Sequence, residues 1–306
     1  MLTHDSLEAA KQLRANHHKF VSPTSLEHAR SFTLRSNDIV IATYPKSGTT
    51  WMQQLVHGIR SSGSMEFEEI TDVVPWLEVA YDVGQDLNAE QCSPVRAFKT
   101  HFSWHEVPKD ARYIVVVRNP DDVLLSYYHF LNGYLFKENS IMLEDFAQEF
   151  FIPGGRSGRY WPHLYSWWSQ IDNPQVLLVS YESMLTDLPV IAERVADFMG
   201  LKVSREILDV AISQASYAFM KANEQQFDDH VVITALNKLH GRTTKDFSSK
   251  IREGHSNSTK MLPLNIKQVL AQCWQEELAS PLGFSDYDSL KQAIDFRIGL
   301  LPGNKA

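Results

Sequence analysis

The sequence predicts an α/β fold, a single domain with a central parallel sheet flanked by helices. Four short apolar runs rich in β-branched residues recur along the chain, at Ile39–Thr43, Val95–Phe98, Tyr113–Val117 and Val176–Ser180. The runs are continuously apolar rather than alternating, which is typical of strands buried on both faces of a parallel sheet. Stretches with helical periodicity separate them, and this alternation of strand and helix is the pattern of doubly wound sheets.

The helical stretches lie between and after the predicted strands. The expected helices are Trp51–Arg60, Asp121–Phe130, Leu143–Phe150, Tyr160–Ser169 and Leu188–Met199. Because no internal repeat or low-complexity linker divides the chain, residues 1–306 are expected to form one domain, with 1–36 as an N-terminal extension. The polar segment 241–262 is expected to be a long loop, and such loops in compact domains are usually functional or disordered.

Composition and charge exclude several classes of protein. The 306 residues are 43% hydrophobic and 22% charged, as in globular proteins with a substantial core. No apolar run approaches the roughly 18 residues of a membrane span, and the N-terminus lacks the apolar segment of a secretory signal. A cytoplasmic protein without membrane contact is therefore expected. Cys92 and Cys273 are expected to be free thiols.

The net charge of −8 argues against a nucleic-acid partner, because phosphate backbones require a basic surface. The acidic residues are unevenly spread, and residues 61–95 contain no Lys or Arg. The twelve histidines form no H-E-x-x-H pattern, so no metal is expected.

The stretch TYPKSGTTW joins the first predicted strand to a helix. A helix that begins at the end of a parallel strand presents free N–H groups and the positive end of its dipole, which together bind anions. Gly48 lets the backbone approach a ligand closely. Ser47, Thr49 and Thr50 add hydroxyl donors, and Lys46 adds a positive charge. The junction therefore predicts a site for a phosphate or a sulfate.

The loop differs from that of the nucleotide triphosphatases, whose motif places Lys directly after its second Gly. Here Lys46 precedes the only glycine, so a smaller anion such as one terminal phosphate fits better. A plain capped helix with a surface lysine is the simpler interpretation. A small-molecule kinase would need Lys after Gly and a magnesium-binding Asp at a strand end, and the chain has neither in the expected place.

A second anion site is predicted after the strand Tyr113–Val117. Arg118 stands at the carboxyl end of that strand, where doubly wound folds place their ligands. Ser126 lies eight residues further on, two turns into the next helix. A guanidinium fork and a hydroxyl suit a separate phosphate.

The motifs PKSGTTW and VRNPDDVLLSYY resemble those of the cytosolic sulfotransferases, over about residues 37–290. Those enzymes transfer a sulfuryl group from 3′-phosphoadenosine 5′-phosphosulfate (PAPS) to a hydroxyl or an amine by in-line displacement, releasing adenosine 3′,5′-bisphosphate (PAP). The resemblance implies that residues 46–50 hold the 5′-phosphate in a P-loop-like manner. It also implies that Arg118 and Ser126 bind the 3′-phosphate, and that Trp51 stacks on the adenine.

The segment FKTHF places His101 just past the second predicted strand. A lone histidine is more often structural than catalytic, but the resemblance implies that His101 is the general base, a role that suits its titration near neutral pH. Lys99 lies two residues earlier on the same face of the extended chain and would reach the sulfuryl group. The resemblance further implies that Lys46 stabilises the leaving oxygen and that Ser126 restrains Lys46.

Further matches extend the resemblance to the adenine. VSYESM places Tyr181, and ASYAFMK places Ser216 and Tyr217, at adenine-side positions of the family. In IREGHSNSTK, Arg252 and Gly254 match the loop 241–262 that covers the cofactor, but Glu253 stands where the family commonly has Lys. The C-terminal dimerisation motif of the family is not evident, so the oligomeric state stays open.

The acceptor pocket is expected around VPWLE, with Trp76 at an aromatic position of the family and Phe130 as a second aromatic. Two interpretations remain open for a phenol, alcohol or amine acceptor. Asp72 or Glu78 in the acidic segment would favour a cationic acceptor, whereas Trp76, Tyr81 and Phe130 fit a flat hydrophobic one. A non-catalytic nucleotide-binding relative is the remaining alternative, and only the altered loop around Glu253 supports it.

Overall fold

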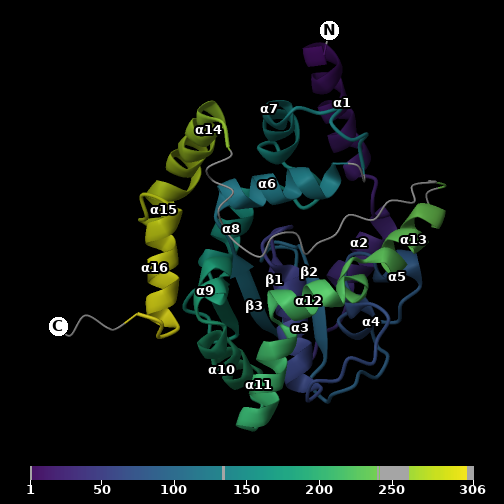
Figure 1. Cartoon of the computed structure of the whole chain (residues 1–306), viewed down its shortest axis with the longest axis vertical. Helices are drawn as coiled ribbons and strands as arrows, with labels where there is room; N and C mark the ends of the chain where they lie inside the picture. Colours follow the sequence, from purple (N-terminus) through teal and green to yellow (C-terminus); the bar gives the residue numbers. More distant parts are fainter. Residues whose placement is uncertain (1, 133–134, 240, 242–261, 302–306) are drawn as a thin grey trace.

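A four-stranded parallel sheet forms the centre of the protein (Figure 1). The computed structural model describes residues 2–132, 135–239, 241 and 262–301. The strands are β1 (Ile39–Thr43), β2 (Ala97–Thr100), β3 (Arg112–Val117) and β4 (Val176–Ser180), in the spatial order β2-β1-β3-β4. The single α/β domain with a central parallel sheet is thus confirmed.

Helices cover both faces of the sheet. The N-terminal half of the chain supplies α1 (Leu2–His17), α2 (Pro23–Ser31), α3 (Thr49–Arg60), α4 (Ile70–Val73), α5 (Ala80–Val83), α6 (Pro120–Leu131) and α7 (Leu143–Phe146), the last continuing as a π-helix over Ala147–Phe151. The C-terminal half supplies α8 (Tyr160–Trp168), α9 (Tyr181–Thr186), α10 (Leu188–Met199), α11 (Arg205–Gln214), α12 (Tyr217–Ala222), a 3₁₀-helix (Glu224–Phe227), α13 (His230–Leu239), α14 (Leu264–Trp274), a π-helix (Gln275–Ala279), α15 (Ser280–Leu282) and α16 (Tyr287–Arg297). Among the described residues, none of these helices is long and apolar enough to cross a membrane.

Alternation along the strands divides the interior into two cores. Ile39 and Ile41 of β1 face a core built with α3, α10 and α11. Val40 and Ala42 face the opposite core, which includes residues of α1, α6, α8 and α16. Because side chains alternate between faces along a strand, a continuously apolar run is needed when both faces are covered.

The second strand lies two residues further along than the sequence indicates. Val95–Phe98 was the expected strand, but β2 is Ala97–Thr100. Its end is fixed by hydrogen bonds on its outer edge, because the Lys99 N–H donates to the Pro75 carbonyl at 2.8 Å and the Leu77 N–H donates to the Lys99 carbonyl at 3.0 Å. Backbone pairing therefore continues past the apolar residues, through Lys99 and Thr100.

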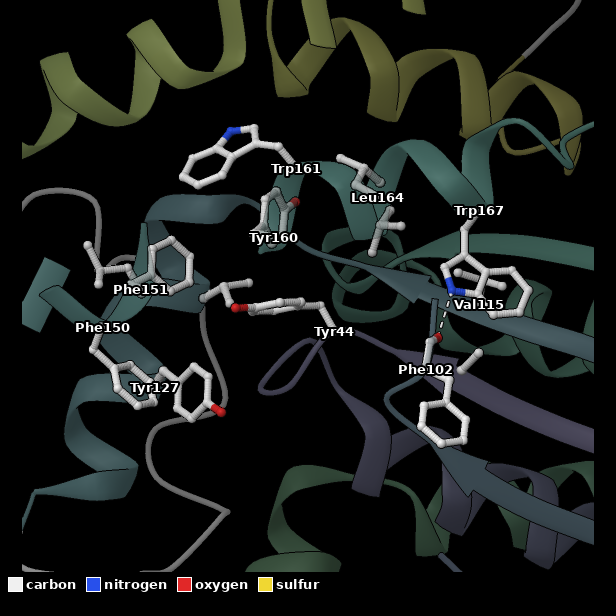
Figure 2. Close-up of a cluster of buried hydrophobic side chains, with 14 of the residues drawn as sticks. Tyr44, Phe102, Val115, Tyr127, Phe150, Phe151, Tyr160, Trp161, Leu164 and Trp167 are labelled. Carbon is white, nitrogen blue, oxygen red and sulfur yellow. Dashed lines mark hydrogen bonds between the residues drawn. The ribbon is translucent and has the colours of Figure 1, made fainter. Parts of the chain in front are cut away.

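Aromatic side chains pack beneath the loop that follows β1 (Figure 2). Tyr44 lies in their centre, with edge contacts to Tyr127, Phe151 and Tyr160 at centroid distances of 6.4, 6.1 and 5.4 Å. Such pairs add roughly 0.5–1.5 kcal/mol each beyond their buried area. The start of the loop is therefore anchored in a rigid core.

The N-terminal helices are part of this core rather than an appendage. Ala10, Leu13 and Ala29 are buried in it. The Ser22 hydroxyl donates to Asp82 at 2.5 Å, which ties the start of α2 to α5. This docking brings the end of α1 to the ligand pocket described next.

Candidate active site

The carboxyl ends of β1, β2 and β3 open into one pocket with a volume of about 220 Å³, called the main pocket below. Its charged and titratable lining side chains are His17, Lys46, Lys99, His101, Arg118, Tyr127, Arg156, Tyr181, Tyr217 and Asp229. Its other lining residues are Phe20, Pro45, Gly48, Thr49, Thr50, Trp51, Trp76, Ser126, Phe130, Leu131, Leu135, Leu185, Ala215, Met220 and Ile233. Ligands of open α/β sheets bind at this edge.

The loop between β1 and α3 forms an anion cradle at the main pocket. Gly48 has a φ of 103°, and a Cβ atom there would lie 2.8 Å from Cδ2 of Tyr181. Helix α3 begins at Thr49 without a side-chain cap on its first N–H groups. Free N–H groups at the start of a twelve-residue helix, next to a glycine, form a site for a phosphate group.

Two side chains of the loop have different environments. The Lys46 ammonium lies in the main pocket, 3.9 Å from the centroid of the Phe130 ring. The Ser47 hydroxyl is buried and lines a separate, smaller cavity beside Tyr44 and Val115. Ser47 is outside the lining of the main pocket, and the expectation that its hydroxyl donates to the ligand stays a prediction.

Arg118 forms a second cationic position in the main pocket. Its Nη1 donates to the Lys46 carbonyl at 3.1 Å, and its Cζ lies 4.1 Å from the centroid of the Tyr181 ring. Its Nε is buried without a hydrogen-bond partner in the part of the chain that the structure describes. Since buried N–H groups are almost always satisfied, this donor indicates a ligand atom. Ser126 of α6 lines the same pocket.

His101 is held as a neutral base. Its Nδ1 lies 2.9 Å from the Thr43 carbonyl oxygen, which can only accept, so Nδ1 carries the proton and Nε2 the lone pair. Burial lowers the pKa of His101 well below its usual 6.5; the Thr43 contact opposes this, whereas nearby Arg156 and Lys99 lower the pKa further. The imidazole is therefore neutral, with an unprotonated Nε2, at neutral pH.

Lys99 forms a buried ion pair that the sequence did not reveal. Its side chain is 2% exposed, and its Nζ lies 3.2 and 3.3 Å from the two carboxylate oxygens of Asp229. The ammonium also lies 4.4 Å from the centroid of the Trp76 ring. Asp229 comes from the turn before α13 and has a φ of 60°, which Asp tolerates better than most residues. The pair holds Lys99 in the wall of the main pocket.

Comparison with known proteins decides which family has this site. Residues 36–279 match the sequence pattern of the sulfotransferase domain family. The chain belongs to the sulfotransferase family. It is 32% identical over 212 residues to a 3-beta-hydroxysteroid sulfotransferase of Cavia porcellus, covering 66% of this chain and 73% of the relative. It is 31% identical over 224 residues to an amine sulfotransferase of Oryctolagus cuniculus, covering 70% and 73%.

Solved structures confirm the fold of this sulfotransferase. The mouse sulfotransferase SULT7A1 complexed with PAP superimposes with a TM-score of 0.67 at 19% identity, covering 91% of this chain and 95% of that one. Retinol dehydratase in complex with androsterone and PAP superimposes with a TM-score of 0.64 at 21% identity, covering 84% and 86%. The sequence-based assignment to the family, and to enzymes of sulfuryl transfer, is confirmed.

The residues predicted to lie beside the adenine occupy different positions in the structure. The Trp51 indole N–H donates to the Ala215 carbonyl at 2.7 Å, and its ring contacts Tyr181 edge-on at 5.3 Å. Tyr217 lines the main pocket, whereas the Ser216 hydroxyl accepts from the Phe219 N–H and caps α12. Arg252 and Gly254, with most of the expected covering loop 241–262, lie outside the described residues.

The acceptor candidates divide into two groups. Trp76 and Phe130 line the main pocket. Tyr81 is 53% exposed and stacks on His28 at 4.1 Å, away from the pocket lining. Asp72 accepts from the Glu69 N–H, and Glu78 accepts from the His101 N–H at 2.7 Å. The last three do not line the main pocket, and their contact with the acceptor stays a prediction.

Sequence reasoning missed several pocket residues. His17 and Phe20 come from the segment expected to be an extension, and Arg156 comes from a glycine-rich loop. Asp229 comes from a polar turn. These segments carry no motif, so only their hydrophobic anchors could have indicated that they dock on the domain.

Three described residues of types that can bind metal ions lie close together. Ligand atoms of Glu69, Asp228 and His230 lie within 4.8 Å of one another. They already serve the start of α13, since Asp228 accepts from the His230 ring at 2.7 Å and Glu69 accepts from the Val231 N–H at 2.6 Å. The group explains how the turn that carries Asp229 is held.

Proposed function

We propose that this sulfotransferase takes PAPS as its donor and transfers the sulfuryl group to a hydroxyl or amine of a small molecule, with His101 as the general base. The observation that carries the proposal is that Lys46, His101 and Arg118 line one pocket at the carboxyl edge of the sheet. The Arg118 guanidinium lies over the Tyr181 ring there, and the Lys46 ammonium lies over the Phe130 ring. The two solved structures described above are complexes with PAP, the product of such a donor.

The loop around Gly48 would hold the 5′-phosphate, and Arg118 with Ser126 the 3′-phosphate. The N–H groups of the first turn of α3 donate to the former. The buried Nε of Arg118 gains a partner in the latter. Trp51 and Tyr181, which contact each other edge-on and both line the main pocket, would form the wall against which the adenine packs.

The donor, when bound, supplies the activated sulfuryl group, and this chain supplies positioning, charge and proton transfer. His101 Nε2 accepts the proton of the acceptor as the new bond to sulfur forms. Lys46 would offset the negative charge of the leaving phosphate when the donor is bound. Lys99, held by Asp229 in the pocket wall, would add positive charge near the bound sulfuryl group.

The acceptor is proposed to be a small molecule with a flat apolar part, which Trp76 and Phe130 contact. Sulfotransferases named for steroids and for amines are among the similar proteins. A cytoplasmic location stays a prediction, and the oligomeric state stays open.

The donor class can be tested by thermal unfolding with PAP, 5′-AMP or ATP–magnesium, each in excess. A ligand at about 100 times its Kd adds about 2.7 kcal/mol to the free energy of unfolding. For a chain of this size we expect PAP to raise the Tm by a few degrees, roughly. We expect 5′-AMP to do less, because it lacks the 3′-phosphate for Arg118. A shift with ATP–magnesium and none with PAP would instead indicate a kinase.

A further inference from the structure

Arg156 is a cation of the main pocket that the proposed donor site does not use. It lies in the turn between Gly155 and Gly158, which are paired across an antiparallel bridge. Its backbone N–H donates to His17 Nδ1 at 3.2 Å, so α1 holds the turn in place. A Cβ atom on Gly155 would lie 2.7 Å from the same nitrogen. The backbone that carries Arg156 is therefore closely packed.

The guanidinium of Arg156 lacks a carboxylate partner among the described residues. Its Nε is buried and has no hydrogen-bond partner there, and its Cζ lies 5.6 Å from the centroid of the Trp76 ring. Two other cations of the main pocket make polar contacts within the chain. Lys99 is paired with Asp229, which is the only carboxylate in the described lining of the main pocket, and Arg118 donates to the Lys46 carbonyl.

Arg156 lies on the side of the pocket where the acceptor would react. The Trp76 indole contacts the His101 ring edge-on at a centroid distance of 5.3 Å and is also the ring beneath the Arg156 guanidinium. Arg118, in contrast, lies over Tyr181 on the donor side. A molecule whose hydroxyl meets His101 would therefore extend along the indole of Trp76 toward Arg156.

We propose that Arg156 determines acceptor specificity by binding an anionic group of the acceptor, a carboxylate separated from the reacting hydroxyl or amine by about one aromatic ring. A guanidinium fork binds a carboxylate through two parallel hydrogen bonds. An unpaired buried donor beside an apolar wall is satisfied by such a ligand. This inference rests on the proposed function and reverses the sequence-based alternative of a cationic acceptor.

The test uses three phenols of similar size that differ in end-group charge: 4-hydroxyphenylacetate, the neutral 2-(4-hydroxyphenyl)ethanol, and tyramine. The same end groups on a hydroxynaphthalene form a second, larger set. The kcat/KM for transfer from PAPS is measured for each, together with the binding of each to the complex of the enzyme with PAP. We expect the wild-type enzyme to prefer the acid over the neutral phenol by about tenfold or more in at least one set, because hydrogen bonds to charged groups contribute about 1.5–3 kcal/mol.

Variants at the same position separate charge from shape. Arg156→Gln is expected to lower kcat/KM for the acid by about 10- to 100-fold and for the neutral phenol by less than about threefold. Arg156→Lys keeps the charge and should retain part of the preference. Arg156→Glu should favour tyramine. Arg205→Gln, which removes an exposed charge on α11, is the matched control and should change none of these values.

Two results would overturn the inference. One is an equal loss for all three phenols in Arg156→Gln, which would place Arg156 at the sulfuryl group. The other is a wild-type enzyme that neither binds nor sulfates the acid better than the neutral phenol in both sets. PAP-induced stabilisation, measured on every variant, reports folding and the donor site separately. If PAP did not stabilise the wild-type enzyme either, that result would instead contradict the proposed function.

Discussion

At the scale of a single residue, the position of His101 at the end of β2 determines its protonation state. The Thr43 carbonyl on the neighbouring strand fixes the proton on Nδ1, and burial with nearby cations lowers the pKa. Neither influence is visible in the segment FKTHF, because both come from other elements. A histidine whose pKa lies well below 6.5 is active as a base over the whole neutral range.

The first prediction follows from this role. His101→Ala should lower kcat for sulfuryl transfer by about 10²- to 10⁴-fold, the usual contribution of a general base, and should leave PAP-induced stabilisation unchanged. His105→Ala, at an exposed histidine four residues away, is the control. In the wild type, kcat/KM should fall only at a pH well below 6.5, because the base is lost when pH drops through the lowered pKa. Turnover by His101→Ala within a few-fold of wild type would remove His101 from the mechanism.

At the scale of an element, the β1–α3 junction is the part of the site that the sequence predicts best. Strand, loop and helix are adjacent in the chain, so a short motif defines both the conformation and the ligand contacts. Gly48 requires positive φ and lies against Tyr181, so two separate effects restrict this position to glycine.

Gly48→Ala tests that statement. A non-glycine residue in the left-handed region costs about 1–2 kcal/mol, and here a Cβ would also overlap Cδ2 of Tyr181 at 2.8 Å. We expect lower stability and a loss of PAP affinity of more than about tenfold. Gly84→Ala is a matched control, since Gly84 has a φ of 72° and an open surrounding, so it should show the backbone cost alone. Equal stability and PAP affinity in the two variants would show that contact with Tyr181 is unimportant.

Other elements show where prediction from sequence ends. The apolar runs located β1, β3 and β4 to within a residue, because a strand covered on both faces must be apolar throughout. The prediction for β2 was wrong by two residues. The last two backbone pairs of this strand with β1 are made by Lys99 and Thr100. Polar residues at the end of a buried strand do not show the apolar pattern that predicts a strand.

The unpredicted site residues share a physical cause. Asp229 and Arg156 lie in turns whose local sequence gives no periodicity, and each reaches the pocket through tertiary contacts, with Lys99 and with His17 respectively. Asp72 and Glu78 were expected near the acceptor because they flank Trp76, yet their carboxylates bond to backbone N–H groups instead. Proximity in the sequence does not determine the direction in which a side chain points.

At the scale of the whole molecule, burial of histidines on both sides of the sheet makes stability depend on pH. Burial lowers the pKa of His57, in α3, to about 4 and that of His163, in α8, to about 4. His101, between them at the sheet edge, shifts in the same direction. In the unfolded chain these groups titrate near 6.5. The unfolded state therefore binds more protons than the folded state below that pH.

The last prediction is that the free energy of unfolding falls as pH drops from 6.5 toward 4. Stability is complete above the unfolded pKa, and each buried histidine removes about 1.4 kcal/mol per pH unit at full proton uptake. Burial raises the pKa of Asp121 to about 6, which opposes the trend, so the comparison must be made between variants. Urea unfolding of His57→Gln, which keeps a donor for the Ser64 carbonyl, should show a slope smaller by about one proton than that of wild type. His105→Gln, at an exposed position, should leave the slope unchanged; an unchanged slope in His57→Gln would mean that His57 is protonated equally in both states.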